Sequence, residues 1–154
     1  IAFSSCISRV SKTSEEIKMA EFIASLIVLA LLGIIDSSYL TWTHFRKKPL
    51  VCPIAGCEAV VESKWSRIFF VRNEILGLMY YAAVLVASIL LFQGLNTIGT
   101  ALNIKTILIT MSSISLLFSA FLVYVQARII RSYCFYCLIS AFINLLIFLN
   151  MLLL

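Results

Sequence analysis

Charged residues are scarce in this sequence: Asp, Glu, Lys and Arg make up 12% of the 154 residues, whereas 62% are hydrophobic. This composition excludes an intrinsically disordered chain, which would be highly charged and weakly hydrophobic. Internal repeats and low-complexity tracts are also lacking. The apolar residues instead form long blocks, which is the pattern of a membrane protein rather than of a soluble core.

The first 18 residues lack an apolar run, because "IAFSSCISRVSKTSEEIK" is polar and rich in serine. A secretory signal has a central apolar segment, so this stretch is not one. The chain also lacks an initial methionine, and Met19 is the first candidate for a native start. We therefore expect residues 1–18 to be an added tail outside the functional domain, and residues 19–154 to form a membrane domain.

Four apolar segments follow, each long enough for a helix to cross roughly 30 Å of hydrocarbon. They cover about residues 20–39 with an extension to 45, then 75–92, 104–129 and 133–154. Only residues 46–74 form a long connection. The expected fold is an all-α integral membrane protein: a bundle of four transmembrane helices in the lipid bilayer, with a short amphipathic helix in the first loop. We expect no nucleic-acid partner.

Two pairs account for four of the five cysteines. Cys52 and Cys57 lie in the long loop, in "CPIAGC", whereas Cys134 and Cys137 form a Cys-x-x-Cys motif at the start of the fourth apolar segment. With four spans, the long loop and the start of the fourth span lie on the same side of the membrane. Both pairs therefore face one compartment, and they form a candidate thiol–disulfide relay.

The position of the Cys-x-x-Cys motif suits disulfide exchange, which needs an attacking thiolate and a second thiol that resolves the mixed disulfide. A helix N-terminus favours a thiolate through its free N–H groups and its dipole. Arg128 and Arg131, just upstream, add positive potential. Cys137 lies about one turn deeper than Cys134. We expect Cys137 to meet a lipid-soluble oxidant and Cys134 to meet the loop pair.

Other interpretations of the cysteines remain open at this point. Four cysteines can hold a structural zinc ion, although the spacing between Cys52 and Cys57 and the position at a membrane edge fit such a site poorly. Cysteines in membrane helices can be inert, and Cys52 and Cys57 can form a purely structural disulfide. In these cases the protein would be a non-catalytic membrane scaffold.

Further motifs accompany the cysteines in a fixed order from the first span to the fourth. The loop pair is followed by "AVVESKWS" and then by "RNEILGLMYY", which enters the second span. With these motifs, over about 130 residues, the sequence resembles the vitamin K epoxide reductase family, in its quinone-reducing microbial branch. Bacterial disulfide bond formation proteins of the B type carry the two cysteine pairs in the opposite order, which argues against that family.

The resemblance implies a thiol oxidoreductase that takes electrons from a thioredoxin-like partner on another chain and passes them to a quinone, generating protein disulfides. The quinone would be of the menaquinone, ubiquinone or vitamin K type, and no metal is expected. Electrons would enter at Cys52, pass from Cys57 to Cys134, and leave from Cys137. Ser63 falls on the family serine and joins these cysteines as a catalytic candidate. Five residues are expected to bind the quinone: Asn73, Tyr81, Trp65, Leu76 and Asn144.

Matches to the family motifs support several of these pocket residues. Asn73 falls on an asparagine that hydrogen-bonds a quinone carbonyl, and Tyr81 falls on a pocket tyrosine. Asn144 matches an asparagine seven residues after the second cysteine of the motif. Two departures accompany these matches. Ala141 stands where epoxide-reducing members carry a tyrosine, and the chain stops at Leu154 without the thioredoxin domain of many microbial members. A quinone or epoxide reductase that recycles quinone is therefore the alternative activity.

Residues around the loop helix and one intramembrane acid need separate mention. Ser63 is expected on the short amphipathic helix. Trp65, with Phe69 and Phe70, is expected either to anchor that helix at the membrane interface or to roof the quinone. Asp36 lies within the first span near its outer end, where an acid marks a functional site, extends to the interface or pairs with an arginine.

The distribution of basic residues predicts which way the protein faces. Lys and Arg near the ends of spans favour the cytoplasmic side. The cysteine side carries eight of them: Arg46, Lys47, Lys48, Lys64, Arg67, Arg72, Arg128 and Arg131. The other side carries Lys105, together with Arg9, Lys12 and Lys18 of the tail. We therefore expect an inverted orientation with the cysteines facing the cytoplasm, although the family usually works outside it, where disulfides persist.

Overall fold

Long helices dominate the computed structural model, which describes residues 2–46, 51–53, 56–68, 71–94, 97–98 and 102–153. They are α1 (Ala2–Phe45), α3 (Asn73–Phe92), α4 (Ile104–Val125) and α5 (Phe135–Leu153), and a π-helical turn, η2 (Gln126–Ile130), continues α4. Each helix has a segment long and apolar enough to cross a membrane: Ile17–Phe45, Asn73–Phe92, Ile104–Ile130 and Phe135–Leu153. The predicted all-α bundle of four membrane-spanning helices is confirmed.

The connections contain the short elements. The first loop holds the helix α2 (Cys57–Val61), the 3-10 turn η1 (Lys64–Ser66), and the two-residue strands β1 (Arg67–Ile68) and β2 (Val71–Arg72). A second small antiparallel hairpin, β3 (Thr97–Ile98) with β4 (Leu102–Asn103), joins α3 to α4. The predicted short helix is therefore present as α2. Ser63 was wrongly expected to lie on it, because α2 ends at Val61.

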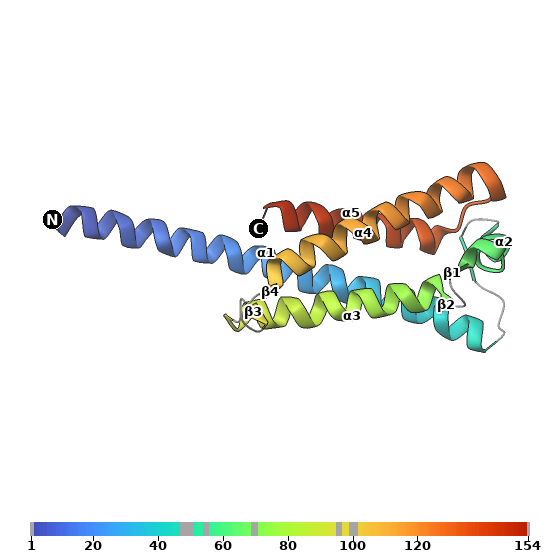
Figure 1. Cartoon of the computed structure of the whole chain (residues 1–154), viewed down its shortest axis with the longest axis horizontal. Helices are drawn as coiled ribbons and strands as arrows, with labels where there is room; N and C mark the ends of the chain where they lie inside the picture. The colour runs from blue at the N-terminus through green and yellow to red at the C-terminus, as the bar shows by residue number, and fades with distance from the viewer. Residues whose placement is uncertain are drawn as a thin grey trace.

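The first helix is longer than the sequence predicted. Its backbone is helical from Ala2, so it continues through the polar tail and extends past the rest of the bundle in Figure 1. A helix that is already nucleated by an apolar segment propagates into neighbouring residues at little cost, which explains the extension. The polarity of residues 1–18 did not predict that the helix begins at Ala2, and the segment apolar enough to cross a membrane begins at Ile17, within the predicted tail.

The helices pack in a specific order. α1 packs along α3 and α5, and α5 also packs along α4, whereas α3 and α4 make few contacts. A buried apolar core joins all four helices: Leu26, Ala30, Tyr81, Val84, Ile104, Leu108, Ile143, Ile147 and Met151. Small residues allow the close approach of α1 and α3, since a Cβ atom on Gly33 would lie 2.5 Å from the Tyr81 ring. The weak contact between α3 and α4 leaves room for a cavity there.

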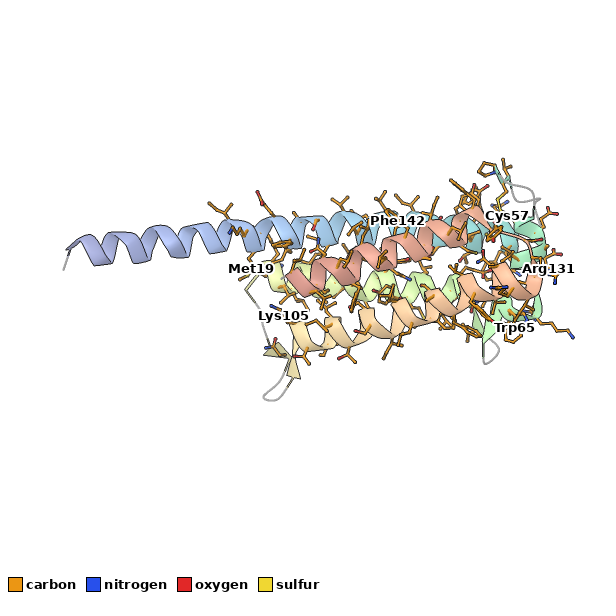
Figure 2. The ribbon with its side chains drawn as sticks, turned by 90° about the horizontal axis from the view of Figure 1, so that it is seen from above. Met19, Cys57, Trp65, Lys105, Arg131 and Phe142 are labelled. Carbon is orange, nitrogen blue, oxygen red and sulfur yellow. A yellow bond between two sulfur atoms is a disulfide. The ribbon has the colours of Figure 1, made fainter. Side chains whose placement is uncertain are left out.

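The cysteine-bearing elements gather at one end of the bundle. Figure 1 shows α2, β1 and β2 beside the end of α1 and the beginnings of α3 and α5. Figure 2 places the labelled Cys57, Trp65 and Arg131 at this end, and Lys105 and Met19 toward the other. The sequence therefore correctly predicted that the long loop and the start of the fourth span share one side.

Candidate functional site

The two cysteine pairs lie together at this end. Cys52 and Cys57 form a disulfide with a Cα–Cα distance of 6.4 Å, whereas Cys134 and Cys137 are thiols. Cys57 is 2% exposed and Cys134 is 0% exposed, and with Val60 they form one buried cluster. Cys52 and Cys137 pack against this cluster. The packing brings the four cysteines into one site, with Cys57 and Cys134 at its centre.

A close backbone contact holds α2 against the beginning of α5. Gly56, just before Cys57, has a φ of 115°, a left-handed conformation that glycine adopts readily. A Cβ atom on Gly56 would lie 3.1 Å from the Cβ atom of Ser132. Gly56 therefore lets the chain turn into α2 while it touches the segment that leads to Cys134.

Cys134 occupies the N-cap position of α5. Its carbonyl oxygen accepts a hydrogen bond from the Leu138 N–H at 3.0 Å, and its own N–H donates to the Gln126 side-chain oxygen at 3.2 Å. The Cys137 thiol donates a hydrogen bond to the Cys134 sulfur and lowers the pKa of Cys134, although burial works against this effect. The geometry therefore favours a thiolate at Cys134, as the sequence predicted for a cysteine at a helix N-terminus.

A largely apolar cavity of about 350 Å³ adjoins the cysteines. A volume in this range suits a small-molecule ligand. Of the four paired cysteines, Cys137 alone lines the cavity. The other site residues predicted from the sequence that line it are Ser63, Trp65, Asn73, Leu76, Tyr81 and Asn144. The structure thus brings the predicted pocket residues together beside one thiol of the Cys-x-x-Cys motif.

The cavity opens sideways between α3 and α4. Leu76 on α3 and Met111 and Ile114 on α4 line it and are also exposed on the outside of the helices. These positions lie within membrane-spanning segments, so the outside is expected to be lipid. A ligand with an apolar tail could therefore enter from the bilayer.

Polar atoms without partners mark the interior of the cavity. In the described part of the chain, four buried side-chain oxygen atoms have no hydrogen-bond partner, and three of them belong to cavity-lining residues: Asn73 Oδ1, Tyr80 OH and Asn144 Oδ1. The amide nitrogen of Asn73 donates to the Trp65 carbonyl oxygen at 3.0 Å, and that of Asn144 donates to Ser119 Oγ at 2.5 Å. Buried polar atoms without partners are costly, so these three oxygens indicate a ligand site.

Asp36 belongs to a second polar group beside the cavity. The Ser140 hydroxyl donates to the Asp36 carboxylate at 2.5 Å, and the Tyr81 hydroxyl donates to the Ser140 carbonyl oxygen at 3.1 Å. Asp36 is buried, and its hydrogen-bond partner is a serine rather than the arginine that the sequence suggested. This network links α1, α3 and α5 next to Cys137.

The loop residues after α2 form the wall of the cavity near the cysteines. Ser63 follows α2 and precedes η1, and its hydroxyl donates to the Val60 carbonyl oxygen at 2.7 Å. Trp65 is half exposed and packs edge-on against Phe121 of α4, with ring centroids 6.0 Å apart. Trp65 therefore covers the cavity from the loop. Phe69 and Phe70, which were expected to assist it, lie outside the described residues.

An ion pair ties the loop to α3. Arg72 donates to Glu74 at 2.5 Å, both side chains are buried, and Arg72 also donates to the Val61 carbonyl oxygen at 3.1 Å. Basic residues that remain exposed at the cysteine end include Arg46, which lies over the Trp42 ring, together with Lys64, Arg67, Arg128 and Arg131. Lys47 and Lys48 lie outside the described residues.

Sequence reasoning missed several polar residues of the site. Tyr80, Ser119, Gln126 and Ser140 all line the cavity, and each has a polar atom placed for hydrogen bonding inside the bundle. Their signal in the sequence was weak, since serines and single amides are common in membrane helices. Within the described residues, no group of three or more His, Cys, Asp or Glu side chains is arranged to hold a metal ion.

Comparison with known proteins identifies a family and a relative. Residues 24–152 match a family model described as the Vitamin K epoxide reductase family. Thiol-disulfide oxidoreductase LTO1 of Arabidopsis thaliana is 29% identical to this chain over 118 residues, which cover 74% of the chain and 31% of LTO1. The chain thus spans about a third of the length of this relative.

Proposed function

Because the chain belongs to the vitamin K epoxide reductase family, we propose that it is a membrane thiol oxidoreductase that links a dithiol partner to a quinone. One arrangement carries this proposal. Cys57 and Cys134 share a buried cluster, whereas Cys137, about one turn further along α5, lines the apolar cavity. One cysteine of the motif thus adjoins the loop pair, and the other adjoins the ligand site.

Electrons enter through the loop pair. A dithiol partner reduces the Cys52–Cys57 disulfide and is itself oxidised to a disulfide. The Cys57 thiolate then attacks Cys134 in a Cys134–Cys137 disulfide, forms a Cys57–Cys134 bond and releases Cys137 as a thiol. Cys52 attacks Cys57, restores the loop disulfide and releases Cys134. The resulting state, with a loop disulfide and two thiols in the motif, is the state of the cysteines in the structure.

Electrons leave through the cavity. Cys134 and Cys137 become a disulfide again, and the two electrons and two protons that they give up convert one quinone into one hydroquinone. The quinone, when bound, is the acceptor of both electrons. The chain supplies the thiol at the cavity wall, the lowered pKa of Cys134 and an apolar enclosure that keeps water away from the thiols.

The cavity fits a quinone in shape and chemistry. Its walls are mostly apolar, as a flat ring and a hydrocarbon tail require, and its side opening faces the lipid. The Asn73 amide donates one hydrogen to Trp65 and keeps a second hydrogen for a ligand carbonyl. Its unpartnered oxygen can accept from a hydroxyl of the reduced ligand. Asn144 has a similar unpartnered oxygen.

The partner is proposed to be a thioredoxin-like protein on another chain. Cys52 is only partly buried, so it is more accessible than Cys57 at the surface of the loop. At the cysteine end, the exposed basic residues Lys64, Arg67, Arg128 and Arg131 outnumber the exposed Glu58 and Glu62, so the described surface there is net positive. Such a surface favours association with an acidic partner.

Redox cycling tests the proposed function. The purified protein in lipid nanodiscs is reduced with excess dithiothreitol, freed of reductant and mixed with a short-chain 1,4-quinone. We expect two protein thiols to disappear for each hydroquinone formed, and we expect Cys137→Ser to form none. A protein that keeps all its thiols in the presence of the quinone would be a scaffold, and the proposal would fail.

The cysteines are proposed to face the cytoplasm. The basic residues cluster at the cysteine end, with Arg131 there and Lys105 toward the opposite end in Figure 2, and this distribution favours a cytoplasmic location. In intact cells treated with an impermeant reductant, Cys52 and Cys57 should therefore resist an impermeant maleimide until the membrane is permeabilised. Labelling of the two residues before permeabilisation would reverse the proposed orientation.

A further inference from the structure

Two adjacent tyrosines of α3 differ in how their hydroxyls are used. The Tyr81 hydroxyl donates to the Ser140 carbonyl oxygen at 3.1 Å. The Tyr80 hydroxyl is buried and has no hydrogen-bond partner in the described residues, although Ser115 of α4 is a polar neighbour. Both residues line the cavity. Among the described residues, Tyr80 therefore offers the cavity a hydroxyl that makes no hydrogen bond of ordinary length and angle, with the Ser115 hydroxyl as its neighbour.

The ring of Tyr80 is held in place by packing. Its centroid lies 5.2 Å from that of Tyr81, with the planes inclined by 59°, a favourable arrangement for two aromatic rings. Tyr81 is in turn fixed by its hydrogen bond and by its contact with Gly33. The Tyr80 hydroxyl is thus positioned before any ligand arrives.

Tyr80 and Asn73 approach the cavity from the same face of α3. They are separated by seven residues, which is two helical turns and a rise of about 10 Å. Long side chains on a helix lean toward its N-terminus, so the Tyr80 hydroxyl is directed back toward the level of Asn73. The Asn73 amide oxygen and the Tyr80 hydroxyl therefore border the cavity at two levels along α3, with apolar cavity wall between them.

Resting on the proposed function, we propose that Tyr80 is a ligand-binding residue that hydrogen-bonds the oxygen of a 1,4-quinone on the side away from Asn73. A hydroxyl can both donate and accept. Tyr80 can therefore donate to the carbonyl oxygen of the quinone and accept from the hydroxyl of the hydroquinone. It would hold the ring through both oxidation states and make the site prefer rings whose two oxygens lie opposite each other.

Substitution by phenylalanine tests this role, because it removes the hydroxyl and keeps the ring. We expect Tyr80→Phe to raise the Kd of a short-chain 1,4-naphthoquinone, followed by Trp65 fluorescence in nanodiscs, by about 3- to 10-fold, the loss of one neutral hydrogen bond. The KM for that quinone should rise in parallel. The matched control is Tyr124→Phe, since Tyr124 lies on α4, is 59% exposed and lies outside the cavity lining. This control should keep the wild-type Kd.

A spectroscopic readout separates binding from a general structural effect. A hydrogen bond lowers the stretching frequency of a ring carbonyl, so the infrared difference spectrum of bound quinone should show one carbonyl band at higher frequency in Tyr80→Phe and an unchanged band in Tyr124→Phe. Unchanged Kd and carbonyl bands in Tyr80→Phe would overturn the role of Tyr80 while leaving the proposed function in place. Wild-type protein that neither binds nor reduces the quinone would overturn the proposed function itself.

Discussion

Gly33 on α1 lies directly against the ring of Tyr81 on α3, so close that a Cβ atom at position 33 would come within 2.5 to 2.6 Å of three ring atoms. The position therefore admits no side chain unless the helices separate or the ring moves. Because Tyr81 also lines the cavity and bonds α5, the contact connects helix packing to the shape of the ligand site.

The first prediction concerns this contact. Gly33→Ala should destabilise the protein by about 1–3 kcal/mol through overpacking, although alanine is the better helix former. Gly77→Ala is the graded comparison, since its Cβ atom would lie 3.1 Å from the Ser37 hydroxyl oxygen, a milder contact. Thermal unfolding in detergent should rank the proteins as wild type, then Gly77→Ala, then Gly33→Ala. Equal stability of Gly33→Ala and wild type would show that Tyr81 is free to move.

The second prediction concerns the route between the cysteine pairs. If Cys57 exchanges with Cys134, then replacing Cys52 and Cys137 with serine and adding a mild two-electron thiol oxidant should trap a Cys57–Cys134 disulfide, because neither resolving thiol remains. Replacing Cys57 and Cys137 instead leaves Cys52 and Cys134, which should form little disulfide. Peptide mapping by mass spectrometry under non-reducing conditions gives both yields. A higher yield for Cys52–Cys134 would reassign the exchanging cysteine of the loop.

The third prediction concerns Asn73. Asn73→Ala should raise the KM for quinone by up to about tenfold, because a hydrogen bond of about 0.5–1.5 kcal/mol is lost and 1.4 kcal/mol corresponds to a factor of ten. Asn150→Ala is the control: Asn150 is also an intramembrane asparagine with an unpartnered oxygen, but it does not line the cavity. Steady-state quinone reduction in nanodiscs measures both. Equal KM values for the two variants would remove Asn73 from the ligand site.

The fourth prediction concerns the titration of Cys134. The hydrogen bond from Cys137 lowers the pKa of Cys134, so the thiolate should form at lower pH than in an ordinary cysteine. Replacing Cys137 with alanine removes that thiol donor, the largest influence lowering the pKa, whereas burial of Cys134 still raises it and the backbone N–H groups of Tyr136 and residue 137 still lower it. Ultraviolet absorbance of the thiolate, recorded against pH with the loop disulfide intact, should therefore show a higher midpoint in Cys137→Ala. A lower midpoint in that variant would contradict the assigned hydrogen bond.

Much of the fold could be predicted because the bilayer imposes a length and a composition on each helix. The shared side of the cysteine pairs then followed from counting spans. Local geometry was harder to predict. Ser63 was placed on a helix because it follows Val60 by three residues, a helical spacing, but its hydroxyl donates to the Val60 carbonyl oxygen and its backbone is extended. A contact of that kind has no periodic signature in the sequence.

The candidate site likewise contains residues that the sequence predicted and residues that it did not. Asn73, Tyr81 and Asn144 could be proposed because motifs mark them, and they do line one cavity. The helical pattern could not show which of the two tyrosines, Tyr80 or Tyr81, has the hydrogen-bonded hydroxyl. Successive helix residues differ by only about 100° in direction, and both side chains reach the same cavity. The Tyr81 hydroxyl is hydrogen-bonded because its partner, Ser140, lies beside it in the fold although it is 59 positions away in the chain. Such long-range partners become known only once the helices are packed.

The helix α2 has a further consequence, because one short segment belongs to both halves of the site. Cys57 begins this helix, and Val60 and Val61 near its end form part of the cavity wall. Any movement of α2 that carries Cys57 away from Cys134 must also displace the two valines from the cavity wall. Exchange between the cysteine pairs and enclosure of the cavity therefore depend on the same position of α2. Arg72, at the end of β2, donates to the Val61 carbonyl oxygen and holds the end of α2 in this position. The cavity wall is thus complete in the same arrangement that packs Cys57 against Cys134.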